Sequence, residues 1–223
     1  MKKFYKYTAT LFVITVLCSC ASYAPKDNQL SVVLTNTQQA ITNLAEKIPA
    51  TGEDNLIQTF NKLQKKSVEL IPALKVCNQK YALTPEYMAT LKEAQKVLQR
   101  VDKDFDTISD KTFLLEAIFL DFDAKLTSIT SSEKNDANTK IKVTVDSNED
   151  EGYFVFGKLS YEKALDIKRF RFNRPTNSAT QDFVPGYYLF WLEKEDLIGE
   201  PELHLIMNNG EEEEKKLVLK TPK

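Results

Sequence analysis

The spacing of apolar residues changes once along this chain, and that change limits what the chain can fold into. Across residues 28–130, apolar side chains recur at alternating intervals of four and three, which is the spacing of amphipathic helices. Across residues 140–223 they recur every second residue, which is typical of short, half-buried strands. The polar segment 131–139 follows neither pattern and is typical of a linker. We therefore predict an α+β protein, in which an N-terminal antiparallel helical bundle precedes a C-terminal antiparallel β-sandwich.

Four helices are expected in the bundle, because the apolar pattern is interrupted at three places. The interruptions are short, as between antiparallel neighbours, and fall at residues 49–52, 80–84 and 109–110. Each helix carries one apolar stripe, so each needs neighbours that cover one side of it. Pro72 lies within the second helix and should kink or split it, because proline removes a backbone donor. The third stripe continues to Ile108, and the fourth helix should end where the first begins.

Six or seven short strands are expected in the sandwich. The almost wholly apolar segment 187–192 is typical of a central strand, and Asn208-Asn209-Gly210 predicts a hairpin between the last two strands. The segment Val184-Pro185-Gly186-Tyr187-Tyr188 is similar to a turn that recurs in transthyretin-like and PEGA-type sandwich modules. That resemblance implies a sandwich and no activity. A polar loop expected at 173–183 departs from the pattern.

The N-terminus has the parts of an export signal. Basic residues open the chain, a short apolar run covers residues 7–16, and Leu17-Cys18-Ser19-Cys20 follows. The apolar run is too short to span a membrane, which takes about 20 residues. The tetrapeptide resembles the lipobox of bacterial lipoproteins, which implies removal of a signal peptide (1–19), a lipid on Cys20 and a tether over 20–27. An ordinary secretory signal with an accidental cysteine is the alternative.

The lipobox resemblance also implies a location. Ala21, rather than an aspartate, follows the cysteine, which resembles the pattern of lipoproteins sent to the outer membrane. No acidic cluster comes next, unlike the surface-export signal of some lipoproteins. We expect a lipid-anchored outer-membrane protein that faces the periplasm, with surface exposure as the alternative. Seven extended residues reach at most about 25 Å, so the first helix should begin near the bilayer.

The charge of the mature chain argues against nucleic acid as a partner. Removal of Lys2, Lys3 and Lys6 with the signal leaves 27 basic and 32 acidic side chains, a formal charge of −5. Phosphate backbones require a concentrated cationic surface instead. The expected partners are the membrane, through the lipid, and another envelope protein. Cys77 is then the remaining free thiol; it lies on an apolar stripe, so we expect it to be buried.

The sequence lacks a recognisable set of catalytic or metal-binding residues. His204 is the single histidine, with no nucleophile and base or second ligand in a known spacing. The aspartates at 102–110 suggest a calcium loop, but Thr107 and Phe113 occupy the positions that need glycine and an acid. We therefore predict a non-enzymatic protein without metal or cofactor.

One basic and aromatic cluster is a candidate binding site. Arg169 and Arg171 should share one face of a strand, and Phe170 and Phe172 the other. This face either is simply a charged exterior or binds carboxylates through bidentate guanidinium contacts. Further candidates, which could instead fill the core, are Arg174, Tyr187 and Trp191.

These observations favour a scaffold or docking subunit of an envelope assembly. The alternative is a ligand-binding or inhibitor lipoprotein that recognises a cell-wall glycan, a peptide or an enzyme. In that case the sandwich loops around 173–183 would form the binding surface.

The lipid anchor is directly testable. Mass spectrometry of the native N-terminal peptide should find acyl chains on Cys20, and Cys20→Ala should move the protein to the soluble fraction. The reason is that each buried methylene contributes about 0.8 kcal/mol to membrane binding. Cys18→Ala is the matched control and should remain lipidated, because small residues suit that position. An unmodified N-terminus in the native protein would contradict the prediction.

Overall fold

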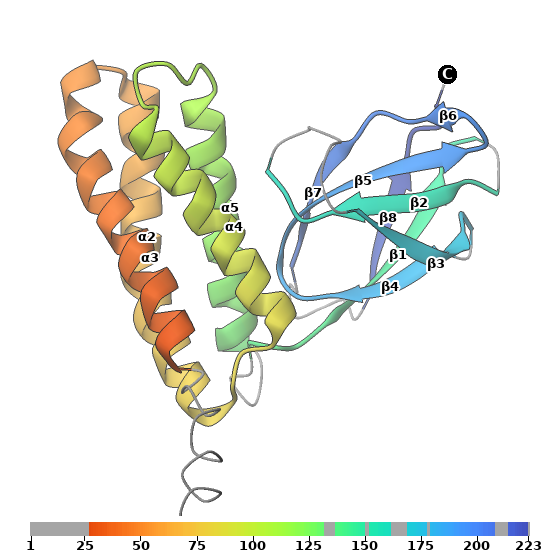
Figure 1. Ribbon diagram of the computed structural model, residues 1–223, viewed down its shortest axis with the longest axis horizontal. Helices are drawn as coiled ribbons and strands as arrows, with labels where there is room; N and C mark the ends of the chain where they lie inside the picture. Colours follow the sequence, from red (N-terminus) through yellow and green to blue (C-terminus); the bar gives the residue numbers. More distant parts are fainter. Residues whose placement is uncertain are drawn as a thin grey trace, which may run out of the picture.

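The computed structural model describes residues 27–131, 137–149, 152–161, 169–177, 179–207 and 214–222. The predicted signal peptide, Cys20 and most of the predicted tether lie outside these residues. Helices come first and strands follow (Figure 1), which confirms the α+β class. The helices are α2 (Asp27–Lys47), the 3-10 turn η1 (Pro49–Thr51), α3 (Asp54–Lys80), α4 (Pro85–Lys103) and α5 (Lys111–Ser131). The strands are β1 (Ile141–Ser147), β2 (Phe154–Lys158), β3 (Phe170–Pro175), β4 (Ala179–Phe183), β5 (Gly186–Lys194), β6 (Leu197–Ile198), β7 (Glu202–Ile206) and β8 (Glu214–Leu219).

The helix boundaries follow local signals with two exceptions. The Thr84 hydroxyl accepts a hydrogen bond from the Tyr87 amide at 3.3 Å and begins α4. Pro72 does not split α3, which continues through it as one helix. Because Pro72 is exposed, water can satisfy the carbonyl that has lost its amide partner. The helix α4 ends at Lys103, before the predicted Ile108, and the chain then turns.

The bundle alternates in direction, so that α2 and α4 run parallel and α3 and α5 run parallel (Figure 1). The most extensive helix packing lies within these two parallel pairs. An ion pair joins Lys47 to Asp102 at 2.6 Å near the ends of α2 and α4, and another joins Lys66 to Asp123 at 2.7 Å between α3 and α5. As predicted, α5 ends at the end of the bundle where α2 begins.

The sandwich consists of two sheets. One has the strand order β4-β1-β8, and the other has the order β3-β2-β5-β6 with β7 also paired to β5. The described strand pairs are antiparallel, as predicted, except that β1 and β8 are parallel. The predicted hairpin turn at 208–210 lies outside the described residues, but the strands on either side of it, β7 and β8, belong to different sheets and do not pair. The predicted loop at 173–183 instead contains the end of β3 and all of β4.

The sandwich core lies between the two sheets. Phe170 and Phe172 point into it, as predicted, with ring centroids 5.5 and 5.7 Å from Phe183. The strand β5 is buried along both faces over residues 186–192, as expected of a central strand. Its inner face contributes Tyr188, Phe190 and Leu192 to this core.

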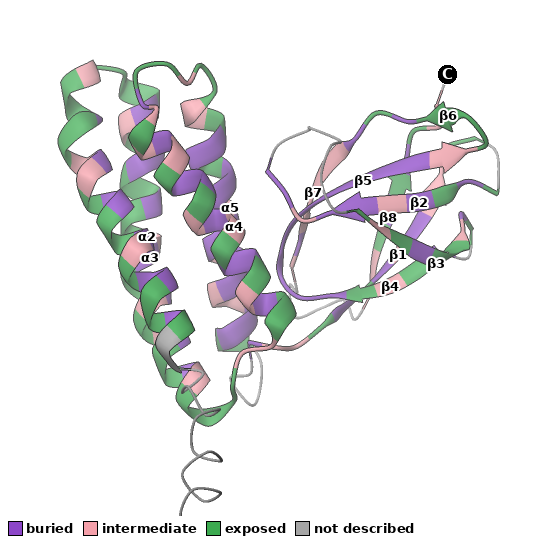
Figure 2. Ribbon diagram, in the orientation of Figure 1, coloured by how far each residue is buried: buried purple, intermediate pink, exposed green. Residues whose placement is uncertain are grey.

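The start of β5 packs against the bundle through its opposite face, and β5 is coloured as buried over most of its length (Figure 2). Tyr187 of β5, together with Leu203 and Leu205 of β7, joins the hydrophobic cluster of the helices. The helix α5 is therefore enclosed on two sides, and the prediction of a single covered stripe is wrong for it. A second buried stripe on α5 consists of Ala117, Asp121, Lys125 and Ser128. Among the described residues, no helix is both long enough and apolar enough to cross a bilayer.

The packing of the sandwich core predicts the effect of one added methyl group. A Cβ at Gly157 of β2 would lie 2.7 Å from ring atoms of both Phe170 and Phe190. Gly157→Ala should therefore lower the free energy of unfolding by about 1–3 kcal/mol, measured by urea denaturation. The exposed Val218→Ala on β8 is the control and should change it by less than about 0.5 kcal/mol. Equal stability of the two variants would contradict this packing.

Candidate functional site

The predicted arginines lie on the outer face of the larger sheet, beside aromatic side chains. We use the name arginine–aromatic face for Phe154, Phe156, Arg169, Arg171, Trp191 and Glu193. Strand register aligns these residues: Phe156 is opposite both Arg171 and Trp191, and Phe154 is opposite Glu193. Side chains of directly opposed residues point to the same side of a sheet. The register therefore brings together residues from β2, β3 and β5.

Cation–π contacts and hydrogen bonds hold the two guanidinium groups in place. Arg169 lies 4.5 Å from the centroid of the Phe156 ring, and Arg171 lies 4.8 Å from that of Phe154. Arg169 also pairs with the carboxylate of Glu193, which accepts a hydrogen bond from the Trp191 indole nitrogen at 2.7 Å. Phe156 stacks on Trp191 with a centroid distance of 6.2 Å. Each exposed cation–π contact contributes about 0.5–1 kcal/mol to this order.

The arrangement is suited to binding an anionic group. Arg169 and Arg171 are exposed, and each guanidinium has five N–H donors, more than Glu193 can occupy. Phe154 is 38% exposed, and Ile198, opposite Glu193 on β6, is 56% exposed. Positioned guanidinium groups bind carboxylates in a bidentate manner, and the apolar side chains beside them add buried area. This surface can therefore bind an acidic, partly apolar partner.

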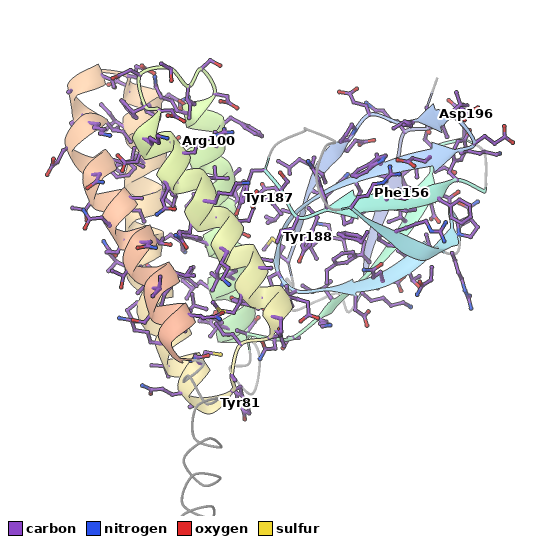
Figure 3. The ribbon with its side chains drawn as sticks, in the orientation of Figure 1. Tyr81, Arg100, Phe156, Tyr187, Tyr188 and Asp196 are labelled. Carbon is purple, nitrogen blue, oxygen red and sulfur yellow. The ribbon has the colours of Figure 1, made fainter. Side chains whose placement is uncertain are left out.

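The other three predicted binding residues have different surroundings. Trp191 is only 1% exposed, so it holds Phe156 and Glu193 in place through its ring and its indole nitrogen and is not a contact residue. Tyr187 lies between the bundle and the sandwich, whereas Phe156 lies farther out on the sandwich (Figure 3). Arg174 is exposed near the end of β3, where the pairing with β2 shifts register. The structure thus brings together Arg169, Arg171 and Trp191 from the predicted set.

A second polar cluster lies at the contact between bundle and sandwich, and sequence analysis missed it. Asp121 and Lys125 of α5 form an ion pair whose side chains are 1% and 0% exposed. The Lys125 amine lies 5.9 Å from the centroid of the Tyr87 ring. A Cβ at Gly186 of β5 would lie 3.3 Å from Asp121 Oδ1 and 3.4 Å from Lys125 Nζ. The sheet therefore approaches this pair through a residue that has no side chain.

Burial shifts the pKa values of the groups around this ion pair. Burial lowers the pKa of Lys125, although the charge and the hydrogen bond of Asp121 oppose the shift. Burial, and next the negative charge of Asp121, raise the pKa of Tyr87 and of Tyr161 well above the ordinary tyrosine value. The same causes, with a smaller contribution from Glu116, raise the pKa of Tyr187 to about 12. All three phenols are therefore neutral at physiological pH.

The geometry gives this ion pair a structural role. A catalytic amine or carboxylate must reach the proton of a substrate, and both of these groups are shielded from solvent. Both side chains belong to α5, and Gly186 of β5 packs against them. The sequence signal was the spacing of Asp121 and Lys125 by four on the most apolar helix, beside the small residues Ala117 and Ala124. Small side chains on a second stripe indicate that another element approaches there.

Other polar residues singled out in the sequence have structural contacts. Cys77 is buried, as predicted, and its sulfur accepts a hydrogen bond from the Ala137 amide at 3.3 Å. Burial lowers the pKa of His204, which lies against Phe190 with a ring centroid distance of 6.0 Å. Asp102 accepts hydrogen bonds from Asn43 and Lys47. Within the described ranges, no group of three or more His, Cys, Asp or Glu side chains is arranged to hold a metal ion.

No protein-family model matches this chain, and no curated protein or solved structure is significantly similar to it.

Breaking the buried ion pair should destabilise the protein strongly. Lys125→Met leaves Asp121 buried without its counter-charge, so we expect a loss of about 3–5 kcal/mol in the free energy of unfolding. The double variant Asp121→Leu/Lys125→Met removes both charges and should be more stable than Lys125→Met alone. Urea denaturation followed by the emission of Trp191 measures both.

Lys66→Met is the matched control for this experiment. It removes a lysine from the partly exposed pair with Asp123, which should cost about 1 kcal/mol or less. Equal losses for Lys66→Met and Lys125→Met would show that the buried pair has no special role.

Proposed function

We propose that this chain is a non-enzymatic lipoprotein, anchored at the outer membrane through Cys20, that acts as a docking subunit of an envelope protein assembly. The arginine–aromatic face carries the proposal for docking, and the lipobox-like tetrapeptide carries the proposal for the anchor. The partner is an envelope protein with an acidic, partly apolar surface, and neither a cofactor nor nucleic acid takes part. The domains face the periplasm.

The way the bundle is joined to the sandwich supports a docking role. Residues of β5 and β7 share a hydrophobic cluster with the helices, and α5 contacts both strands. A docking surface on the same sheet is then held in a constant position relative to the bundle and to the start of α2. A constant position favours assembly, because little conformational freedom is lost when the partner binds.

The contacts within the arginine–aromatic face support the same function. Arg169 and Arg171 are already ordered over aromatic rings, which lowers the entropy cost of binding. The alternative function relied on a sandwich loop at 173–183, and β3 and β4 account for most of that segment. We therefore favour protein docking through the sheet face over ligand binding through that segment.

A photo-crosslinking experiment in intact envelopes tests this function. A benzophenone side chain at Phe154 should form one specific adduct with an envelope protein, because Phe154 is exposed beside both arginines. Arg169→Ala/Arg171→Ala in the same protein should remove most of the adduct. Residues of this type at binding hot spots contribute about 2 kcal/mol or more each, roughly 30-fold in affinity.

The same photoreactive side chain at Val218 serves as the control. Val218 is similarly apolar and exposed but lies on β8 of the other sheet, so it should not form the adduct. An adduct that persists in the arginine variant would contradict docking through this face. An adduct with peptidoglycan instead of a protein would favour the alternative function.

A further inference from the structure

One end of the bundle exposes an aromatic residue, a valine and two lysines. We use the name near end for this part of the bundle, which contains the connection between α3 and α4. It lies where α2 begins and α5 finishes (Figures 1 and 3). Tyr81 is 43% exposed there, and Val76 in the last turns of α3 is 54% exposed. Lys75 and Lys80 beside them are also exposed. The near end therefore combines apolar and cationic side chains on one surface.

The charge of the bundle differs between its two ends. Residues 75–86 at the near end contain Lys75, Lys80 and the single acid Glu86. The far end is the opposite end of the bundle, where α2 connects to α3 and α4 connects to α5. Its residues 46–54 and 100–111 contain seven acidic and four basic side chains. An anionic surface would therefore attract the near end and repel the far end.

The position of the chain start brings the near end close to a membrane. The helix α2 begins there at Asp27, seven residues after Cys20. Those seven residues span at most about 25 Å when fully extended. A lipid on Cys20 would thus hold the near end within a short distance of the bilayer, whereas α4 alone carries the chain about 28 Å away from it.

We propose that the near end of the bundle is a bilayer-contacting surface, in which Tyr81 and Val76 enter the headgroup region and Lys75 and Lys80 bind lipid phosphates. This inference rests on the proposed lipid anchor and adds the orientation of the protein on the membrane. Tyrosine is enriched at membrane interfaces, where its ring is apolar and its hydroxyl remains hydrated. Lysines near an anionic surface contribute attraction that is independent of the anchor.

The difference in charge between the two ends of the bundle then sets the orientation of the protein on the membrane. The near end faces the lipid, and the acidic far end points away from it. The α2–α3 and α4–α5 connections form the far end, and each lies one helix length from the near end. The helix axes therefore point away from the bilayer. The sandwich, packed against α4 and α5, is held beside the bundle.

Fluorescence quenching in vesicles tests this contact. The chain beginning at Cys20 retains every described residue, and its Cys20 thiol can be coupled to a maleimide lipid because Cys77 is buried. The vesicles contain phosphatidylethanolamine, phosphatidylglycerol and a brominated phosphatidylcholine. In Tyr81→Trp, the added emission should shift to shorter wavelength and be mostly quenched by the bromine. Trp191 is buried and supplies a constant background.

Phe113→Trp is the matched control. Phe113 is 52% exposed but lies near the start of α5, at the far end of the bundle. Its emission should remain unshifted and unquenched on the same vesicles. Lys75→Gln and Lys80→Gln, added to Tyr81→Trp, should each weaken the surface contact about fivefold. Equal quenching at the two tryptophan positions, or none at Tyr81→Trp, would overturn the proposal.

The chemical coupling separates this inference from the proposed function. It supplies the anchor in vitro, so the vesicle result depends only on the near end of the bundle. Acylation of Cys20 in cells is measured independently by mass spectrometry of the native protein. An unlipidated native N-terminus with strong quenching at Tyr81→Trp would contradict the anchor and leave the bilayer contact supported. A lipidated native N-terminus without quenching at Tyr81→Trp would contradict the bilayer contact alone.

Discussion

The packing of α5 between two hydrophobic layers determines how the rest of this protein is arranged. One side of α5 completes the bundle, and another side covers the outer face of β5 and β7. The ion pair of Asp121 and Lys125 lies within the second contact and is removed from water. Because an unpaired charge in such a place is very costly, each of the two charges can be buried only beside the other. The pair lies within one helix, and the missing side chain of Gly186 lets β5 pack against it.

The coverage of the larger sheet by α5 divides its outer face into two parts. Near the bundle, Tyr187 is buried against the helices, and Leu203 and Leu205 are partly buried there. On other strands of the same sheet, Phe154 of β2 and Ile198 of β6 remain exposed. An apolar surface that a folded protein leaves open in this way is a common sign of an interaction site. The arginine–aromatic face is the part of the sheet that the bundle does not reach.

The order within the arginine–aromatic face comes from its least exposed members, Trp191 and Glu193. Trp191 is buried, yet its indole nitrogen fixes the carboxylate of Glu193, and that carboxylate holds Arg169. Phe156 stacks on the same indole and also contacts the guanidinium of Arg169 through its ring. A buried residue thus determines the position of an exposed one. Pre-positioned side chains of this kind lose less entropy when a partner binds.

Part of this surface and most of the secondary structure are visible in the sequence alone. The alternation along β3 correctly separates Arg169 and Arg171 from Phe170 and Phe172, because side chains of a strand point to opposite faces whatever surrounds it. The same local geometry explains why the helices of the bundle and the central strand β5 were predicted, and why Thr84 caps α4. Phe154, Phe156 and Glu193 were missed because strand register, which brings them to the arginines, is a long-range property.

The amino-acid sequence by itself determined the four helices, most of the strands and which side chains of β3 share a face, since these depend on backbone geometry within a few residues. Only the tertiary structure decided what covers each face. It buried Asp121 and Lys125, placed Trp191 below the surface and paired β8 with β1 in parallel. The physical reason is that burial and strand pairing depend on residues distant in the chain, and local periodicity carries no information about them.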